Sequence, residues 1–128
     1  MTGMVLRIGE VAARTELSIK TIRHYDEVGL VVPSARSSGG FRLYTADDVD
    51  RLLAIRRMKP LGFTLEQMRQ LLAALGTVES AGADATELEQ ARTYLADCHE
   101  RAERACVSLT RQLAYARELT DQLARFSR

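Results

Sequence analysis

The apolar residues at the start of this chain recur with the period of an α-helix. Ile8, Val11 and Ala12 share one face of a short predicted helix, and residues 15–17 make a turn after it. Ser18 is a suitable N-cap for a second helix. The chain therefore begins with two short helices joined by a tight turn.

The second predicted helix turns Ile19 and Ile22 inward, and Gly29 ends it as a C-cap. Its remaining faces carry basic, hydroxyl and aromatic side chains, namely Lys20, Thr21, Arg23, His24 and Tyr25. This pair of helices is typical of a helix-turn-helix, and the second helix can offer long hydrogen-bond donors to a groove of DNA.

A glycine-containing hairpin is predicted directly afterwards. Residues 37–40, Ser-Ser-Gly-Gly, allow positive φ angles, so two short strands can fold back as a wing. Arg36 and Arg42 flank this turn, with Phe41 and Tyr44 nearby. Arginine neutralises phosphates, and Arg, Lys and Thr also reach base edges, so the helix and the wing together predict contact with duplex DNA. The alternative for Arg23, His24 and Tyr25 is a solvated helix face with a packing aromatic. For Tyr25 and Tyr44 a further interpretation stays open, in which the ring serves the core and only the hydroxyl reaches a phosphate.

Two further helices are predicted from capping boxes. Thr45 with Asp48 begins the third, which has an apolar face and a basic end and is stopped by Pro60. Thr64 with Gln67 begins the fourth in the same way. The apolar face of the fourth helix consists of Leu65, Met68, Leu71, Leu72 and Leu75.

Gly76 is predicted to end the fourth helix, and the small, polar residues 77–86 form a linker. Beyond the linker, apolar residues recur every seven positions in two companion stripes, which we call the heptad seam. The first stripe is Leu88, Leu95, Ala102, Leu109, Ala116 and Leu123, and the second is Ala91, Cys98, Ala105, Leu119 and Phe126, interrupted at Gln112.

A helix of about 40 residues is about 60 Å long, far more than a small head can cover, so we expect it to pack on a second copy of the chain. The residues predicted to hold this dimer are Leu88, Leu95, Cys98, Ala102, Leu109, Ala116, Leu119 and Leu123. The predicted organisation is a winged helix-turn-helix head at 1–76, the linker at 77–86 and a dimerisation helix at 87–128.

The net charge of +1 over 128 residues averages two unlike parts. Residues 1–76 carry 11 Lys and Arg against 8 Asp and Glu, whereas residues 77–128 carry 7 against 9. The surplus of basic residues lies in the part that carries the predicted helix-turn-helix. No apolar run suits a membrane span or a signal peptide, so we expect a cytoplasmic protein with no membrane partner.

Four segments in order resemble the MerR family of transcriptional regulators: RIGEVA at 7–12, TIRHYDEVGLVVP at 21–33, GGFRLYTADDVDRL at 39–52 and LGFTLEQMRQLL at 61–72. The resemblance implies a mainly α fold, with a DNA-binding winged helix-turn-helix head and a small β-hairpin wing, followed by a long antiparallel coiled-coil dimerisation helix. It also implies a second wing formed by the third and fourth helices, in which Arg56, together with Arg57 or Lys59, reaches phosphates.

For function, the resemblance implies a homodimer on a pseudo-palindromic promoter, where it bends and untwists the spacer between the elements read by RNA polymerase. The alternatives are a DNA architectural or recombination accessory protein of the excisionase type, and a coiled-coil module without a DNA role. No nucleophile with an adjacent base and no phosphate-cradling glycine loop is present in the sequence, so no enzyme and no cofactor are expected.

Cys98, His99 and Cys106 are the candidates for a thiol or metal site. The two cysteines are eight residues apart, so they lie within about 80° of each other on a helix. We favour packing, since a thiol in an apolar stripe behaves as a small apolar filler and a closed zinc site needs four ligands. A redox-sensing thiol pair and a metal site remain the alternatives, and the sequence names no effector.

Overall fold

The computed structural model describes residues 5–127 of the chain. In order, its elements are β1 (Val5–Arg7), α1 (Ile8–Thr15), α2 (Ile19–Glu27), β2 (Ala35–Arg36), β3 (Arg42–Thr45), α3 (Ala46–Met58), the 3-10 turn η1 (Lys59–Leu61), α4 (Leu65–Glu79) and α5 (Ala85–Ala124). The predicted head and dimerisation helix also include residues 1–4 and Arg128, which lie outside the described residues. Of the helices within residues 5–127, none is both long and apolar enough to cross a bilayer.

The small sheet is antiparallel, with β3 between β1 and β2. Leu6 pairs with Tyr44, and both side chains are buried beneath α1 and α3. The strand β1 was not predicted, since its only partner is the distant β3. The hairpin of β2 and β3 was predicted and is confirmed, with Gly40 at a φ of +83° in its turn.

The helix-turn-helix forms as predicted, except that one residue predicted to face inward is exposed. Ser18 caps α2 by accepting a hydrogen bond from the backbone N–H of Thr21 at 3.0 Å. Ile22 is buried, but Ile19 is 39% exposed, so its predicted inward position is wrong. The inward partner of Ile22 is Tyr25, which lies three residues later on the same face.

Capping boxes start the helices α3 and α4 as predicted. Thr45 and Asp48 exchange both bonds of the first box, and Thr64 and Gln67 those of the second. The predicted end of α4 at Gly76 is wrong, because the helix continues to Glu79. An interior glycine costs a helix only about 1 kcal/mol relative to alanine, which is too little to end a helix by itself. The connection to α5 is consequently residues 80–84, shorter than the predicted linker.

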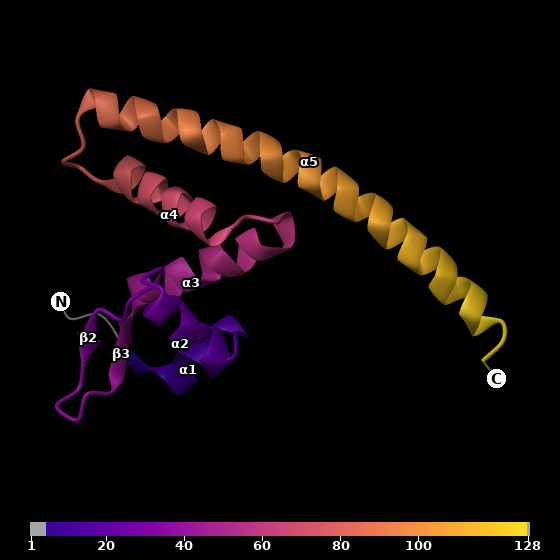
Figure 1. The fold of residues 1–128 in the computed structure, drawn as a ribbon, viewed down its shortest axis with the longest axis horizontal. Helices are drawn as coiled ribbons and strands as arrows, with labels where there is room; N and C mark the ends of the chain where they lie inside the picture. The colour runs from indigo at the N-terminus through magenta and orange to yellow at the C-terminus, as the bar shows by residue number, and fades with distance from the viewer. Residues whose placement is uncertain (1–4, 128) are drawn as a thin grey trace.

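The helix α5 spans 40 residues, with Asp84 as its N-cap. Figure 1 shows it as a long curved rod whose first part runs alongside α4 and whose second part extends beyond the rest of the chain. Arg101 of α5 lies over the ring of Phe63 at 4.9 Å, and Tyr94 donates to the Gln67 carbonyl at 3.3 Å. These contacts attach the first half of α5 to the head.

Candidate nucleic-acid interface

The exposed side of α2 carries the donors that the sequence predicted. Lys20, Arg23 and His24 are exposed, and Thr21 is half-buried beside the Ser18 cap. The opposite side is anchored in the core by Ile22 and Tyr25. The helix therefore has one face fixed by packing and one free to enter a groove, as a recognition helix requires.

The wing is attached to α2 by a shared carboxylate. Asp26 of α2 is only 9% exposed at its side chain, and its Oδ2 accepts from Arg42 Nε at 2.6 Å and from Arg36 Nη2 at 3.3 Å. The Asp26 hydrogen bond raises the pKa of Arg42 further above its ordinary value, so this guanidinium stays charged. Asp26 thus fixes both predicted wing arginines against the recognition helix, a role that sequence reasoning missed.

A groove of about 610 Å³ opens between the wing, α2 and the N-terminus of α1. Three arginines line it, Arg7, Arg23 and Arg42, with Glu10 as the acid among the lining residues. The Arg7 guanidinium lies 5.6 Å from the centre of the Phe41 ring. Arg7 was not predicted as a site residue, although it is the first residue of the RIGEVA segment that carried the family resemblance. This groove is concave and basic, which suits a phosphate backbone.

Tyr44 cannot serve as the predicted DNA contact in this conformation. Its side chain is fully buried, and its hydroxyl has no hydrogen-bond partner in the described structure. Burial raises the pKa of this hydroxyl. Tyr25 is 4% exposed, so its ring also belongs to the core. Both rings therefore lie in the core, and the predicted contact of the Tyr25 hydroxyl with a phosphate stays a prediction.

The two arginines at the basic end of α3 differ in their contacts: Arg56 bonds to its own chain, and Arg57 is exposed. Arg56 Nη1 donates to the Thr15 carbonyl at 2.8 Å and lies 3.4 Å from Glu16, so it braces the turn of the helix-turn-helix. Arg57 is exposed, as is Lys59 in η1. If Arg56 contacts a phosphate as predicted, it must do so through its remaining N–H donors. Within residues 5–127, neither Arg57 nor Lys59 makes a comparable hydrogen bond to the helix-turn-helix.

A further arginine braces the recognition helix from behind. Arg69 of α4 donates to the carbonyls of Gly29 and Val28 at 2.9 and 3.1 Å. Those carbonyls follow the last turn of α2, where free acceptors and the helix dipole favour a cation. Arg69 thereby links the recognition helix to α4 and, through α4, to α5.

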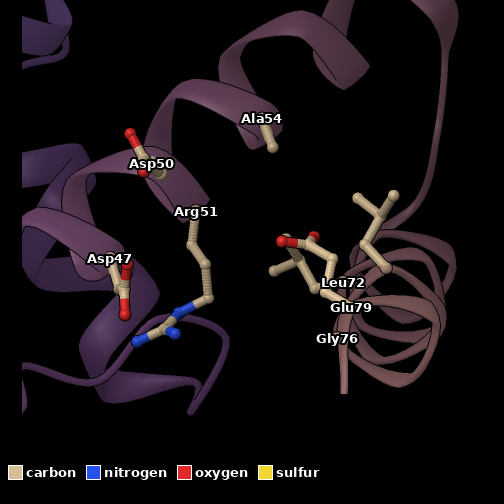
Figure 2. A pocket seen from close by; sticks show the side chains of 8 residues that line it. Asp47, Asp50, Arg51, Ala54, Leu72, Gly76 and Glu79 are labelled. Atoms are coloured by element: carbon tan, nitrogen blue, oxygen red, sulfur yellow. The ribbon is translucent and has the colours of Figure 1, made fainter. Parts of the chain in front are cut away.

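A second cleft, of about 420 Å³, separates α3 from α4 and has the opposite character. Asp47, Asp50 and Arg51 line it from α3, and Glu79 of α4 points across it toward α3 (Figure 2). Arg51 pairs with the buried Asp48. The remaining charge of this cleft is acidic, so it does not suit a phosphate backbone.

The two predicted thiol candidates lie in different environments, one buried and one exposed. Cys98 is 5% exposed and belongs to the core cluster of the head, so its predicted place in a dimer interface is wrong: its own chain already covers it. Cys106 is exposed, as is His99. Within residues 5–127, no three His, Cys, Asp or Glu side chains gather into a group that could hold a metal ion.

Comparison with known proteins matches this architecture. Residues 6–75 match the family described as MerR HTH family regulatory protein. The HTH-type transcriptional regulator HmrR of Rhizobium leguminosarum bv. viciae is 40% identical over 87 residues, which cover 68% of this chain and 67% of HmrR. The regulator ZntR of Escherichia coli K12 is 46% identical over 67 residues, covering 52% of this chain and 48% of ZntR. The matched region thus spans about two thirds of one relative and half of the other.

Among solved structures, HiNmlR is described as a MerR family regulator lacking the sensor domain, bound to promoter DNA. It superposes with a TM-score of 0.67 at 22% identity, covering 94% of this chain and 89% of HiNmlR. At that identity the match shows a shared fold. The family and the two relatives are regulators, so the comparisons do not favour the excisionase-type alternative or a coiled coil without a DNA role.

Proposed function

The chain belongs to the MerR family of transcriptional regulators, and on that premise we propose that it is a homodimer that binds a pseudo-palindromic promoter through α2 and the wing. The observation that carries this proposal is the basic groove, where Arg7, Arg23 and Arg42 meet beside the exposed face of α2. HiNmlR, which shares the fold, is bound to promoter DNA in its own structure. The proposed site of action is the cytoplasm.

Three groups of residues have distinct roles in this proposal. Lys20, Thr21, Arg23 and His24 face the major groove, where Arg and Lys can read base edges. Arg7 and the wing arginines follow the phosphate backbone on one side of α2. Arg57 and Lys59 reach phosphates on the other side, as a second wing. The wings fix position, and α2 provides sequence preference.

The proposed regulatory mechanism is deformation of the promoter. Two heads joined by a rigid rod fix the distance between two half-sites, so the DNA must bend or untwist to meet both. Bending a site of this size costs about 1–6 kcal/mol, which wing contacts to the backbone offset. RNA polymerase is the proposed partner, because realigned promoter elements are what it reads.

Replacing Arg23 by alanine tests the recognition helix. We expect operator binding to weaken by roughly 1–3 kcal/mol, because one base-edge or phosphate contact is lost. Mobility shifts at fixed, moderate salt measure it, with Arg111→Ala as control, since Arg111 is exposed on α5 far from the basic groove. Equal operator dissociation constants for Arg23→Ala and Arg111→Ala would contradict the placement of α2 in the DNA interface.

Replacing Leu109 by aspartate tests the dimer. Leu109 lies in the heptad seam, so the charge would be buried without a partner, and we expect sedimentation to show a monomer that no longer binds the operator. Val107→Asp is the matched control, because Val107 is 62% exposed on the side of α5 away from the seam. A stable Leu109→Asp dimer would mean that the interface lies elsewhere.

A further inference from the structure

Ile19 is the first residue of α2, and it is exposed although its side chain is large and apolar. The residue is 39% exposed, whereas Ile22, three positions later, is fully buried. Among the described residues, Ile19 belongs neither to the core cluster of the head nor to the apolar residues packed against it. Figure 1 shows α2 on the side of the head away from α5, so the long helix of the same chain leaves Ile19 uncovered. Packing within the chain therefore does not account for an isoleucine at this position.

The place of Ile19 on α2 puts it beside the residues proposed to face DNA. Successive residues turn by about 100° around a helix, so Ile19 lies about 40° from Arg23, one turn later. Arg23 and Lys20 are both exposed. Side chains of an α-helix tilt toward its N-terminus, so Ile19 projects from the end of α2. This is the end that a recognition helix directs at base edges.

An isoleucine in the major groove has one favourable partner among the base edges. Its side chain has no hydrogen-bond donor or acceptor, so it cannot bond to a phosphate or to a polar base edge. The C5-methyl group of thymine is the apolar feature of that groove. Contact between the two removes apolar surface of both from water. A cytosine would instead present its N4 amino group, which would lose water without gaining a hydrogen-bond acceptor.

We propose that Ile19 is a specificity-determining residue that packs against the C5-methyl group of one thymine in each half-site of the operator. The inference rests on the proposed function and adds to it the base that one position of α2 selects. Ile19 and Arg23 are four residues apart, which is about 6 Å along the helix axis. Stacked bases are about 3.4 Å apart along a strand. The two side chains can therefore meet neighbouring base pairs of the same half-site.

The cap of α2 holds Ile19 in a fixed direction. The backbone N–H of Thr21 donates to Ser18 Oγ at 3.0 Å, and the Ser18 hydroxyl donates to Thr21 Oγ1 at 2.9 Å. Ile19 lies within this closed turn, and a β-branched side chain has one strongly preferred rotamer in a helix. Little conformational entropy is then lost when the side chain meets a methyl group. The long side chain of Lys20 has no such restriction.

A double-mutant cycle between protein and DNA tests the contact. The probe is the shortest duplex that the native chain selects from a random-sequence pool, with each thymine replaced in turn, in both half-sites, by deoxyuridine, which lacks only the methyl group. We expect one thymine at which this change raises the dissociation constant of the native chain roughly 3- to 10-fold per half-site. The same change should leave binding by Ile19→Ala unaltered, because that variant lacks the contact. Cytosine at this position should weaken the native chain more than deoxyuridine does.

Ile19→Val and Arg23→Ala are the matched controls. Valine keeps a branched apolar side chain, so Ile19→Val should retain the sensitivity to deoxyuridine at the same thymine. Arg23→Ala should bind both duplexes more weakly and still distinguish them, because its methyl contact is intact. Each variant is compared with itself on two duplexes, so any change in its folding cancels from the comparison.

Two results would overturn the inference while leaving the DNA-binding function in place. One is a native chain that no replacement of thymine by deoxyuridine weakens. The other is an equal loss for the native chain and Ile19→Ala, because a different residue would then contact the methyl group. A chain that enriches no sequence from the pool would overturn both the proposed function and the role of Ile19.

Discussion

The carboxylate of Asp48 secures the base of the wing, and its removal should cost the head much of its stability. Asp48 is fully buried, and it accepts hydrogen bonds from Ser34 N at 3.0 Å, Ser34 Oγ at 2.9 Å and Thr45 N at 2.9 Å. It also pairs with Arg51 one turn along α3. One side chain therefore joins the segment before β2, the end of β3 and the start of α3.

The magnitude follows from which partners are lost. Hydrogen bonds to a charged group contribute about 1.5–3 kcal/mol each, and breaking a buried pair costs about 3–5 kcal/mol. The Arg51 side chain is 43% exposed, so water can solvate its guanidinium once the Asp48 carboxylate is removed. The lost stability therefore comes mainly from the hydrogen bonds of Ser34 and Thr45. We expect Asp48→Ala to lower the free energy of unfolding by about 3–5 kcal/mol, a large part of the roughly 5–15 kcal/mol typical of a folded domain.

Urea unfolding followed by circular dichroism, at one fixed protein concentration, measures this difference. Asp47→Ala and Asp50→Ala are matched controls, because both residues are exposed and lie within two positions of Asp48 on α3. Each control should change the free energy of unfolding by less than about 1 kcal/mol. An Asp48→Ala variant no less stable than these controls would refute the argument.

The same carboxylate should make stability depend on pH. Burial alone would raise the pKa of Asp48, but hydrogen bonds from Thr45 and Ser34 and the charge of Arg51 outweigh it and hold the pKa below its ordinary value. A folded pKa below the unfolded one stabilises the fold above the unfolded pKa of about 4 and ceases to do so as pH falls through the folded value. The stability gap between the native chain and Asp48→Asn should therefore shrink below about pH 4.

Two other predictions concern the head. Tyr44→Phe should leave the free energy of unfolding unchanged or raise it by about 1 kcal/mol, because it removes a buried hydroxyl without a partner; thermal unfolding measures this, and a clear loss would mean that the hydroxyl has a partner. Arg69→Gln should weaken operator binding roughly 3- to 10-fold while dimerisation persists, because the end of α2 loses its brace; an unchanged dissociation constant in a mobility shift would contradict this.

The elements with local signals could be predicted from the sequence. Capping boxes at Thr45 and Thr64, the glycine turn of the wing and the seven-residue period of α5 each depend on residues close together in the chain. The strand β1 could not, because its pairing with β3 joins residues about forty positions apart. The end of α4 was misplaced because a single glycine costs a helix only about 1 kcal/mol and so does not fix the end by itself.

The candidate site was predictable in its residue types and less so in their roles. Arg23 is exposed on α2 as predicted, but Arg42 and Arg56 make internal bonds that no pattern revealed. A basic residue near a helix end looks the same whether it braces a carbonyl or reaches a phosphate. Cys98 shows the same limit, since one heptad period describes both the part of α5 that the head covers and the part left bare.

Hydroxyl-radical footprinting on a promoter fragment selected from the source genome tests the central claim most directly. A homodimer that reads DNA through α2 and the wing should protect two half-sites related by a dyad, with loss of both when Leu109→Asp breaks the dimer. Protection should resist moderate salt, because base contacts add to the phosphate contacts. Binding that protects no defined sequence and disappears at moderate salt would contradict a sequence-specific regulator.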